Sequence, residues 1–302
     1  MFGGGNDLFN KKLLIHSKNV DETDTGNKTY ESLRYYAMNN VADYSTITEL
    51  PQSAIDYLNM VIPTDMLGCF MGCSKLKNID LSCLTDVSQV SDFTGCFKTC
   101  TELLSITIPQ WDLSNVTSTN SMFYSCTKLQ DLSFVSNWNV SKVTNMGGMF
   151  AFCRGISSIN LTSWDTSRVL NFYYFIGDTY ITSLDLSNFN TASATDLTWM
   201  FAGSSIRNLD ISNFTVTTSN VSNMFYYTSL RYLIIGSNTF KFNMTDSNCG
   251  NLNTTCKILV PSSLISTYQN ATNWSSRASQ FDAIENYTIT KSNGQVTVTP
   301  NS

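Results

Sequence analysis

The stretch WNVSKVTNMGGMFAFC, residues 138–153, decides the fold, because its parts recur along most of the chain. Its Phe150 belongs to a series of phenylalanines separated by 27, 26, 27, 25, 26 and 24 residues. The series is Phe70, Phe97, Phe123, Phe150, Phe175, Phe201 and Phe225. Units of this length cannot bury an apolar face alone, so they stack on one another. The repeat therefore predicts a solenoid.

A short apolar alternation follows each phenylalanine and predicts a strand. The alternating pairs are Ile79/Leu81, Ile106/Ile108, Leu132/Phe134, Ile159/Leu161, Leu184/Leu186, Leu209/Ile211 and Leu233/Ile235, and Ile258–Val260 fits one further step. Strands that recur once per coil lie side by side, so we expect a parallel sheet of about eight short strands.

Between one strand and the next phenylalanine, the apolar spacing changes. Val143, Met146, Phe150 and Cys153 are 3, 4 and 3 residues apart, which is the spacing of one face of a helix. We therefore expect short helical segments on the side of the solenoid opposite the sheet. Tight turns are predicted where Asp precedes Ser by two residues, as at Asp165, since such side chains bond nearby backbone amides.

Four of the nine cysteines form one column of the repeat. Cys73, Cys100, Cys126 and Cys153 each lie three residues after a phenylalanine, and this column continues as Asp178, Ser204 and Thr228. Small thiols in such a column pack as apolar residues, so we expect them in the core. The alternatives are a zinc site or stacked disulfides formed by Cys69, Cys73, Cys96 and Cys100.

No catalytic residue, metal site or cofactor is predicted. The sole histidine, His16, stands outside the repeats, so any Cys–His pair for nucleophilic catalysis would need it. No two carboxylates stand in a motif with the geometry that glycoside hydrolysis requires. Gly3, Gly4 and Gly5 are not followed by the Lys-Ser/Thr of a phosphate-binding loop.

The composition excludes several classes of protein. Charged residues make up 14% of the chain and the net charge is −5, which argues against nucleic acid as a partner. Aromatic residues make up 12%, enough to argue against a disordered chain. No apolar stretch approaches the roughly 20 residues that span a bilayer, so no membrane insertion is expected. The opening MFGGGND does not resemble a secretory signal.

The ends differ from the repeats. Residues 1–29 are Gly-rich and then polar, and we expect an N-terminal arm with one strand at Leu13–Ile15. Residues 30–65 are expected to form a helical cap, residues 66–260 the solenoid, and residues 261–286 a C-terminal capping helix. In residues 287–302, two alternating runs flank Asn293-Gly294, which predicts a β-hairpin.

The sheet face that points away from the core is the candidate binding surface. It carries small polar side chains, and its last strand carries the larger side chains of Tyr232 and Ile234. We expect ligand contacts from one residue of each strand: Asp80, Thr107, Ser133, Asn160, Asp185, Asp210 and Tyr232. Extended faces of this kind serve as binding surfaces in stacked solenoids. The alternative is that the face is polar because it is solvated.

The units LDLSNFNT (184–191), INLTSWDTSRV (159–169) and WNVSKVTNMGGMFAFC resemble the BspA-type leucine-rich repeat, also described as a bacterial lipoprotein surface repeat. The resemblance covers residues 66–286. It implies an α/β leucine-rich-repeat solenoid, surface display and adhesion. The segment NKKLLIHS (10–17) is similar to the openings of phage structural proteins.

Together these features lead us to expect a non-enzymatic binding or structural protein at a virion surface. Residues 1–29 would hold it to other virion proteins, and the sheet face would bind a protein or glycan of the host surface. One alternative is a bacterial cell-surface adhesin. Another is an enzyme that uses the acidic stripe on a carbohydrate. Stacking of chain ends or an odd thiol could produce an oligomer.

Overall fold

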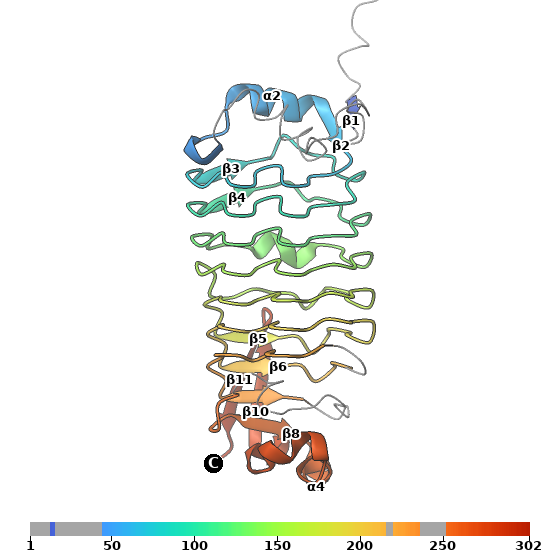
Figure 1. Cartoon of the computed structure of the whole chain (residues 1–302), viewed down its shortest axis with the longest axis vertical. Helices are drawn as coiled ribbons and strands as arrows, with labels where there is room; N and C mark the ends of the chain where they lie inside the picture. The colour runs from blue at the N-terminus through green and yellow to red at the C-terminus, as the bar shows by residue number, and fades with distance from the viewer. Residues whose placement is uncertain (1–12, 16–43, 216–219, 236–251) are drawn as a thin grey trace, which may run out of the picture.

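The computed structural model describes residues 13–15, 44–215, 220–235 and 252–302. The repeats form a solenoid of about seven coils stacked along one axis (Figure 1). The solenoid predicted from the repeat is therefore confirmed. Among the described residues, no helix is long and apolar enough to cross a membrane.

One side of the solenoid carries the parallel strands. β3 (Asn78–Asp80) pairs with β4 (Ser105–Thr107). A second sheet has the order β5-β6-β7-β8-β9, with β5 at Ser183–Asp185, β6 at Asn208–Asp210, β7 at Tyr232–Ile234, β8 at Lys257–Val260 and β9 at Phe281–Ala283. Equivalent apolar residues of adjacent coils are in register, as Leu184 is with Leu209.

The sheet is interrupted where strands were expected at Leu132 and Ile159. The residues after Leu132 form a 3-10 helix instead, η3 (Ser133–Asn137). Six positions separate Leu132 from Trp138, whereas five separate Ile159 from Trp164. The helix accommodates this extra residue and is held by local bonds, since Ser136 Oγ donates to the Ser133 carbonyl at 2.7 Å.

The helical segments predicted opposite the strands are not formed. In the coil of Phe97, alternate amides donate to the next coil: Phe93 to Ser118, Gly95 to Asn120 and Phe97 to Met122, at 2.8–2.9 Å. The amides between them close tight turns, as Cys96 does with Phe93 at 3.1 Å. Left-handed residues such as Gly95 (φ 62°) and Thr99 (φ 59°) separate these turns and prevent a helix. The residues at the 3, 4, 3 spacing are nevertheless buried in the core, as Val143, Met146, Phe150 and Cys153 are.

The core is a stack of aromatic rings, one or two per coil. Phe70, Phe97, Phe123 and Phe150 are all buried, and successive ring centroids lie 5.4, 5.4 and 5.9 Å apart. A second buried column consists of Trp111, Trp138, Trp164, Phe189 and Phe214. The stack therefore gives each coil an apolar partner above and below.

The predicted phenylalanine column is wrong by one residue at Phe175. The Phe150 amide donates to the Phe175 carbonyl and the Ile176 amide to the Met200 carbonyl. Ile176 therefore occupies the column of Phe150 and Phe201. The cysteine column accordingly continues as Thr179, not as the predicted Asp178. Both Phe175 and Ile176 are buried, so their apolar character alone does not show which one occupies the column.

The thiols lie in the core, as expected. Cys100, Cys126 and Cys153 are fully buried, and each Sγ donates to a carbonyl of the preceding coil at 3.0–3.1 Å. In later coils, hydroxyls of Thr179, Ser204 and Thr228 replace them and bond within their own coil. Among the described residues, no group of His, Cys, Asp or Glu is placed to hold a metal ion.

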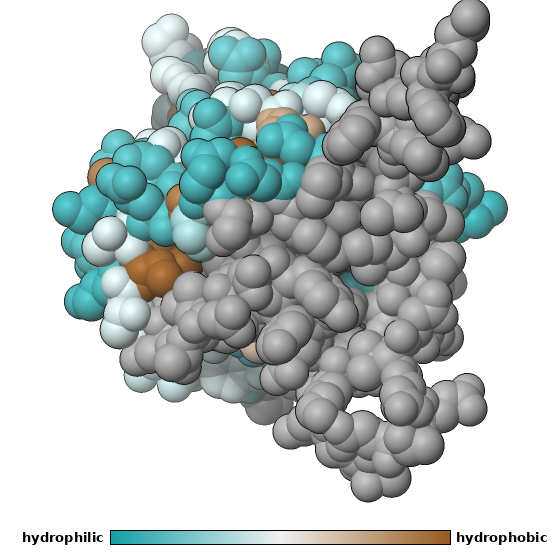
Figure 2. Space-filling model, turned by 90° about the horizontal axis from the view of Figure 1, so that it is seen from above, coloured by the Kyte–Doolittle hydropathy of each residue, from teal (hydrophilic) through white to brown (hydrophobic). Residues whose placement is uncertain are grey.

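The N-terminal end carries η2 (Tyr44–Thr46) and helix α2 (Gln52–Met60), which crosses the first coil (Figure 1). β1 (Leu13–Ile15) pairs in parallel with β2 (Val61–Pro63), so the strand expected in the arm is present. The other residues of the arm, including His16, and the expected cap residues 30–43 lie outside the described part. Seen from this end, the described surface is mostly hydrophilic (Figure 2).

At the other end, the single helix expected over 261–286 is divided. It consists of η4 (Ser262–Leu264), α4 (Ile265–Gln269) and η5 (Thr272–Gln280), followed by β9 and η6 (Ile284–Asn286). The predicted hairpin is confirmed as β10 (Tyr287–Ser292) and β11 (Gln295–Pro300). Asn293 (φ 49°) and Gly294 (φ 73°) both adopt the left-handed backbone that such a two-residue turn requires.

The ring stack predicts a large loss from one truncation. Phe123→Ala removes a ring packed between Phe97 and Phe150 and should lower the free energy of unfolding by about 3–5 kcal/mol in urea denaturation. The control Phe152→Ala truncates a half-buried ring and should lose far less. Equal losses would contradict a core centred on this stack.

The buried thiols predict a loss of stability at alkaline pH. Burial raises the pKa of Cys153 from 9.0 to about 12. The folded state keeps a proton that the unfolded chain releases, so this contribution is complete below pH 9 and is lost as the pH rises toward 12. The slope for one thiol is at most about 1.4 kcal/mol per pH unit.

Urea denaturation between pH 8 and pH 11 measures this effect. Cys153→Thr places the residue of the equivalent position 179 in the column and removes the ionisable group. The stability of this variant should fall less steeply above pH 9 than that of the parent chain. An unchanged slope would show that Cys153 does not contribute.

Candidate functional site

The C-terminal hairpin lies across part of the sheet face that was predicted to be an exposed binding surface (Figure 1). Lys291 Nζ approaches Asp210 at 2.6 Å and Asp185 at 3.5 Å, and it donates to Ser187 Oγ at 2.8 Å. Asp185 and Asp210 are only 5% and 2% exposed. Both predicted ligand contacts are therefore already engaged by the chain itself, and the expectation of an open face fails over these coils.

Backbone atoms of the hairpin are bound by polar side chains of the sheet. Ser183 Oγ bonds both the carbonyl and the amide of Val296, the latter at 2.8 Å. Asn208 Nδ2 donates to the same carbonyl at 3.3 Å. The amide of Asp185 donates to the Gly294 carbonyl at 2.7 Å. Two side chains and one backbone amide of the sheet thus bind the backbone of the hairpin.

An apolar cluster completes the docking. Ile234, Leu259, Val296 and Val298 are buried together, with Tyr232 and Tyr287 packed against them. The rings of Tyr232 and Tyr287 meet edge to face at 5.5 Å. Tyr232, predicted as a ligand contact, therefore contacts the hairpin.

The tip of the hairpin requires glycine. A Cβ on Gly294 would lie 2.6 Å from both the Asn160 Cα and the Ile159 carbonyl oxygen. No side chain fits between position 294 and this coil, because the nearest atoms belong to the backbone and cannot move aside. Asn160, another predicted contact, is therefore half-buried beside the tip.

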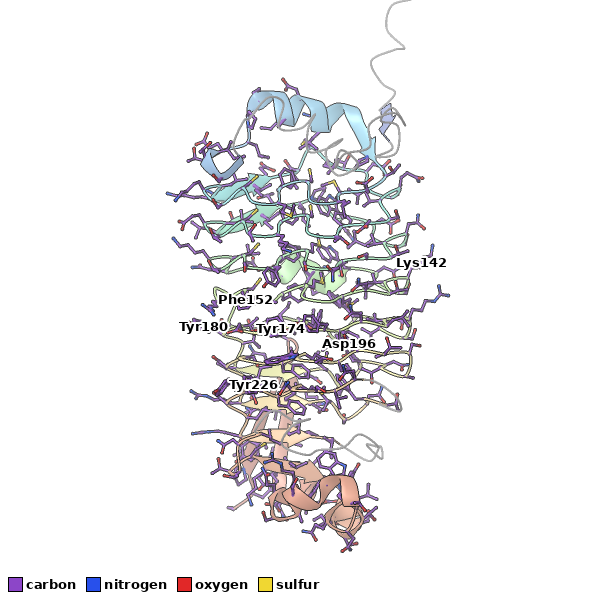
Figure 3. The ribbon with its side chains drawn as sticks, viewed as in Figure 1. Lys142, Phe152, Tyr174, Tyr180, Asp196 and Tyr226 are labelled. Carbon is purple, nitrogen blue, oxygen red and sulfur yellow. The ribbon has the colours of Figure 1, made fainter. Side chains whose placement is uncertain are left out.

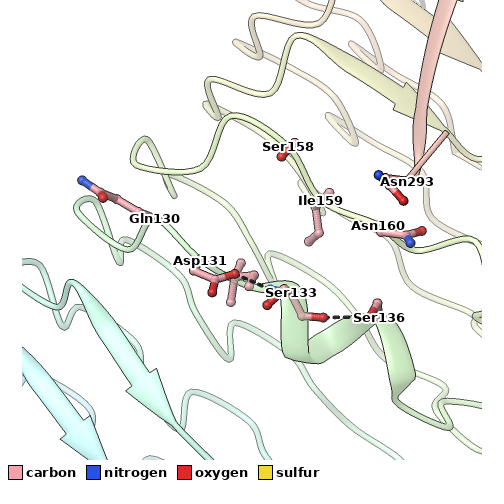
Figure 4. A pocket seen from close by; sticks show the side chains of 9 residues that line it. Gln130, Asp131, Ser133, Ser136, Ser158, Ile159, Asn160 and Asn293 are labelled. Carbon is pink, nitrogen blue, oxygen red and sulfur yellow. Dashed lines mark hydrogen bonds between the residues drawn. The ribbon is translucent and has the colours of Figure 1, made fainter.

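A cavity of about 270 Å³ lies beside the turn of the hairpin, and most of the residues that line it are of polar types. It is lined by Gln130, Asp131, Leu132, Ser133, Ser136, Ser158, Ile159, Asn160 and Asn293 (Figure 4). The Ser133 amide donates to Asp131 Oδ1 at 2.7 Å, which holds that carboxylate at the rim. The cavity thus brings together two predicted residues, Ser133 and Asn160, with a hairpin residue.

The remaining predicted residues stay exposed. Asp80 on β3 and Thr107 on β4 are paired across the ladder, and both side chains face solvent. Asp80 Oδ1 accepts the Ser82 amide at 2.9 Å, and bonds from the amide and hydroxyl of Ser82 lower the pKa of Asp80. The face therefore has an exposed part on β3 and β4, a cavity, and a part covered by the hairpin.

Sequence reasoning missed the partners on the hairpin. Lys291 and Asn293 lie in a hairpin that is predicted without a docking site, and the predicted ligand contacts do not include Ser183 or Asn208. The turn signal at Asn293-Gly294 was a local clue to the hairpin. No local signal pairs Lys291 with carboxylates 81 and 106 positions earlier in the chain.

The ion pairs of Lys291 predict a measurable role in hairpin docking. Lys291→Met keeps the aliphatic stem and removes the charge, leaving two buried carboxylates without their cation. The free energy of unfolding should fall by about 1.5–3 kcal/mol, and hydrogen exchange at the Val296 amide should accelerate.

The matched control is Lys128→Met. Lys128 pairs with Glu102 at 2.6 Å, but both side chains are well exposed, at 52% and 32%. Exposed pairs contribute little to stability, so this variant should behave like the parent chain. A Lys291 variant with unchanged Val296 exchange would show that the ion pairs do not hold the hairpin.

The comparisons with known proteins identify a family for this chain. No curated protein matches the chain. The model of the family described as "Mycoplasma protein of unknown function, DUF285" matches residues 36–157 and 130–234. Together these segments span more than half of the chain, and the match is consistent with the BspA-type repeat seen in the sequence. The chain belongs to the DUF285 family.

Proposed function

We propose that this chain is a non-enzymatic binding protein that holds an extended segment of a partner protein on the exposed part of its sheet face. The site consists of β3 and β4, with the polar cavity at its far end. A rigid solenoid keeps these side chains at fixed positions, which reduces the entropy lost on binding.

The docked hairpin is the observation that carries this proposal. Ser183, Asn208 and Asp185 bind its backbone and its lysine. The same columns on the exposed coils hold Asn78, Ser105 and Asp80. All three side chains are exposed and carry the same hydroxyl, amide and carboxylate groups, and Ser105 Oγ donates to Asn78 Oδ1 at 2.8 Å. A segment that presents an unpaired backbone edge and a lysine has the matching chemistry, as in other strand-based peptide recognition.

A protein partner suits this face better than a glycan. The exposed strands carry hydroxyl, amide and carboxylate groups, but no aromatic ring on which a sugar could stack. The sole aromatic residue among the predicted contacts, Tyr232, packs against Tyr287 of the hairpin.

The proposed setting is the surface of a virion, and the alternative is the bacterial cell surface. In either setting, residues 1–29 would attach the solenoid to its support. Strand β1 within this segment pairs with β2 and so links the segment to the solenoid. Mass spectrometry of density-purified particles and of washed cell envelopes separates the settings. Enrichment in envelopes would contradict the virion.

A binding experiment with the chain's own hairpin tests the proposed face. The probe is a synthetic peptide of residues 285–302, added to the full chain. The covered part of the face is occupied, so the peptide should bind weakly at β3 and β4. NMR shifts should centre on Asn78–Asp80 and Ser105–Thr107. Binding elsewhere, or none, would contradict the proposal.

Asp80→Asn should weaken this binding several-fold, because the amide cannot pair with Lys291 of the peptide but keeps the bond to the Ser82 amide. The matched control is Asp165→Asn. Asp165 accepts the Ser167 amide at 3.0 Å in the same kind of turn, in a column away from the sheet face. This control should bind like the parent chain, and equal weakening would indicate a nonspecific effect of charge.

A further inference from the structure

A second surface feature lies apart from the sheet face. Six aromatic side chains follow one another along the outer turns of successive coils, and we call them the outer aromatic strip. They are Tyr124, Phe152, Tyr174, Trp199, Tyr226 and Tyr227. Figure 3 shows Phe152, Tyr174 and Tyr226 from this set at three levels of the solenoid.

The rings of the strip form a continuous chain. Successive centroids lie 5.2, 5.3, 6.4, 5.0 and 4.1 Å apart from Tyr124 to Tyr227. The first five rings are half-buried, and Tyr227 is 72% exposed. The strip is therefore a surface feature, distinct from the buried stack of Phe70 to Phe150.

Several of these residues occupy backbone positions that favour glycine. Phe152, Tyr174, Trp199 and Tyr227 have φ of 60°, 54°, 61° and 54°. In the other coils these two columns hold glycine or a small or polar residue. They are Gly68, Gly95, Ser121, Gly148 and Asn223 in the column of Tyr174 and Trp199, and Gly72, Thr99, Ser125, Asp178 and Gly203 in the column of Phe152 and Tyr227. A bulky residue in this conformation is strained.

Strained residues concentrate at functional sites, where the strain is maintained for a purpose other than stability. The core does not need these rings, because the glycines in other coils support the same turns. An exposed aromatic chain maintained against backbone preference points to a ligand.

The charges beside the strip are already engaged. Arg154 pairs with Asp178 at 3.3 Å and lies over the Phe152 ring at 5.7 Å, and the Tyr174 hydroxyl donates to Asp178. Lys98 Nζ lies 5.1 Å from the centroid of the Tyr124 ring. The strip thus combines aromatic faces with hydroxyls and paired charges, which favours an uncharged ligand with both apolar and hydroxyl groups.

We propose that the outer aromatic strip binds a linear, uncharged polysaccharide that runs along the solenoid axis. A sugar ring has an apolar face that packs on an aromatic ring, and its hydroxyls bond to neighbouring polar groups. Rings repeated from coil to coil suit a polymer of repeated sugar units. This site is separate from the proposed peptide face, so either can fail independently.

The test variant uses residues that other coils have at the equivalent positions. Tyr174→Gly with Trp199→Asn installs the residues found at Gly148 and Asn223 in the same column. Both residues suit a left-handed backbone, so the thermal midpoint should not fall. The control, Leu170→Thr, replaces another exposed apolar residue (44%) by the residue of Thr144 and Thr195 in its column.

Affinity electrophoresis of the full chain in gels with hydroxyethylcellulose, glucomannan or laminarin measures binding. At least one of these polymers should retard the parent chain and the Leu170 variant. Retardation of the double variant should be weaker at least tenfold. Absence of retardation by all three, or equal retardation of the double variant, would overturn the proposal. So would binding confined to poly-L-proline or to dextran sulfate.

Tryptophan fluorescence gives a readout that needs no variant. Trp111, Trp138, Trp164 and Trp274 are buried, whereas Trp199 is half-buried at the surface. A polysaccharide on the strip should protect the exposed fluorescence from acrylamide quenching. Retardation without this protection would place the polymer elsewhere and overturn the proposal.

Discussion

The hydrogen bonds from each coil to the next are the constraint on which the rest of the structure depends. Alternate amides of each turn region donate to carbonyls one coil further on, and they fix the register between coils. That register stacks Phe70, Phe97, Phe123 and Phe150 within contact distance. A single coil has no neighbouring coil to accept its amide hydrogen bonds or to cover its aromatic ring, so its backbone groups and its apolar face would both be exposed to water. Stacking satisfies both requirements at once.

The same register determines what the two surfaces offer. On the strand side, it aligns polar side chains in columns, and the chain uses part of these columns to bind its own hairpin. Lys291, Gly294 and Val296 meet Asp210, Asp185 and Ser183 there. The exposed coils carry Asp80 and Ser105 in the columns of Asp185 and Asn208, with Thr107 in the place of the second carboxylate, and the proposed peptide site rests on this similarity. On the turn side, the register aligns positions of left-handed backbone. Where other coils place glycine or a small polar residue there, four positions carry aromatic rings, at a cost in backbone strain.

Two coils without a strand lie between the two sheets, and the first of them contains η3. The coil of η3 has one extra residue before Trp138, whereas the coil of Ile159 has the ordinary spacing and also lacks a strand. The buried residues Leu132 and Trp138 keep their columns, so the core is continuous across the interruption. The cavity lies at this point, between η3 and the hairpin tip. Core and surface are therefore separable in this fold: apolar columns maintain the solenoid, while the segments between them can vary.

The sequence by itself determined the repeat, the buried columns, the turn residues and the hairpin at Asn293-Gly294. These features follow from local periodicity and from the backbone preferences of single residues, which act wherever the segment lies. The tertiary structure decided the rest. The 3, 4, 3 spacing identified the buried face, but the amides of the next coil offered bonds that replaced the helix. Only those bonds showed that Ile176, and not Phe175, continues the column of Phe150. Docking of Lys291 on Asp185 and Asp210 joins segments about a hundred positions apart, and a pattern of local spacings carries no information about such a contact.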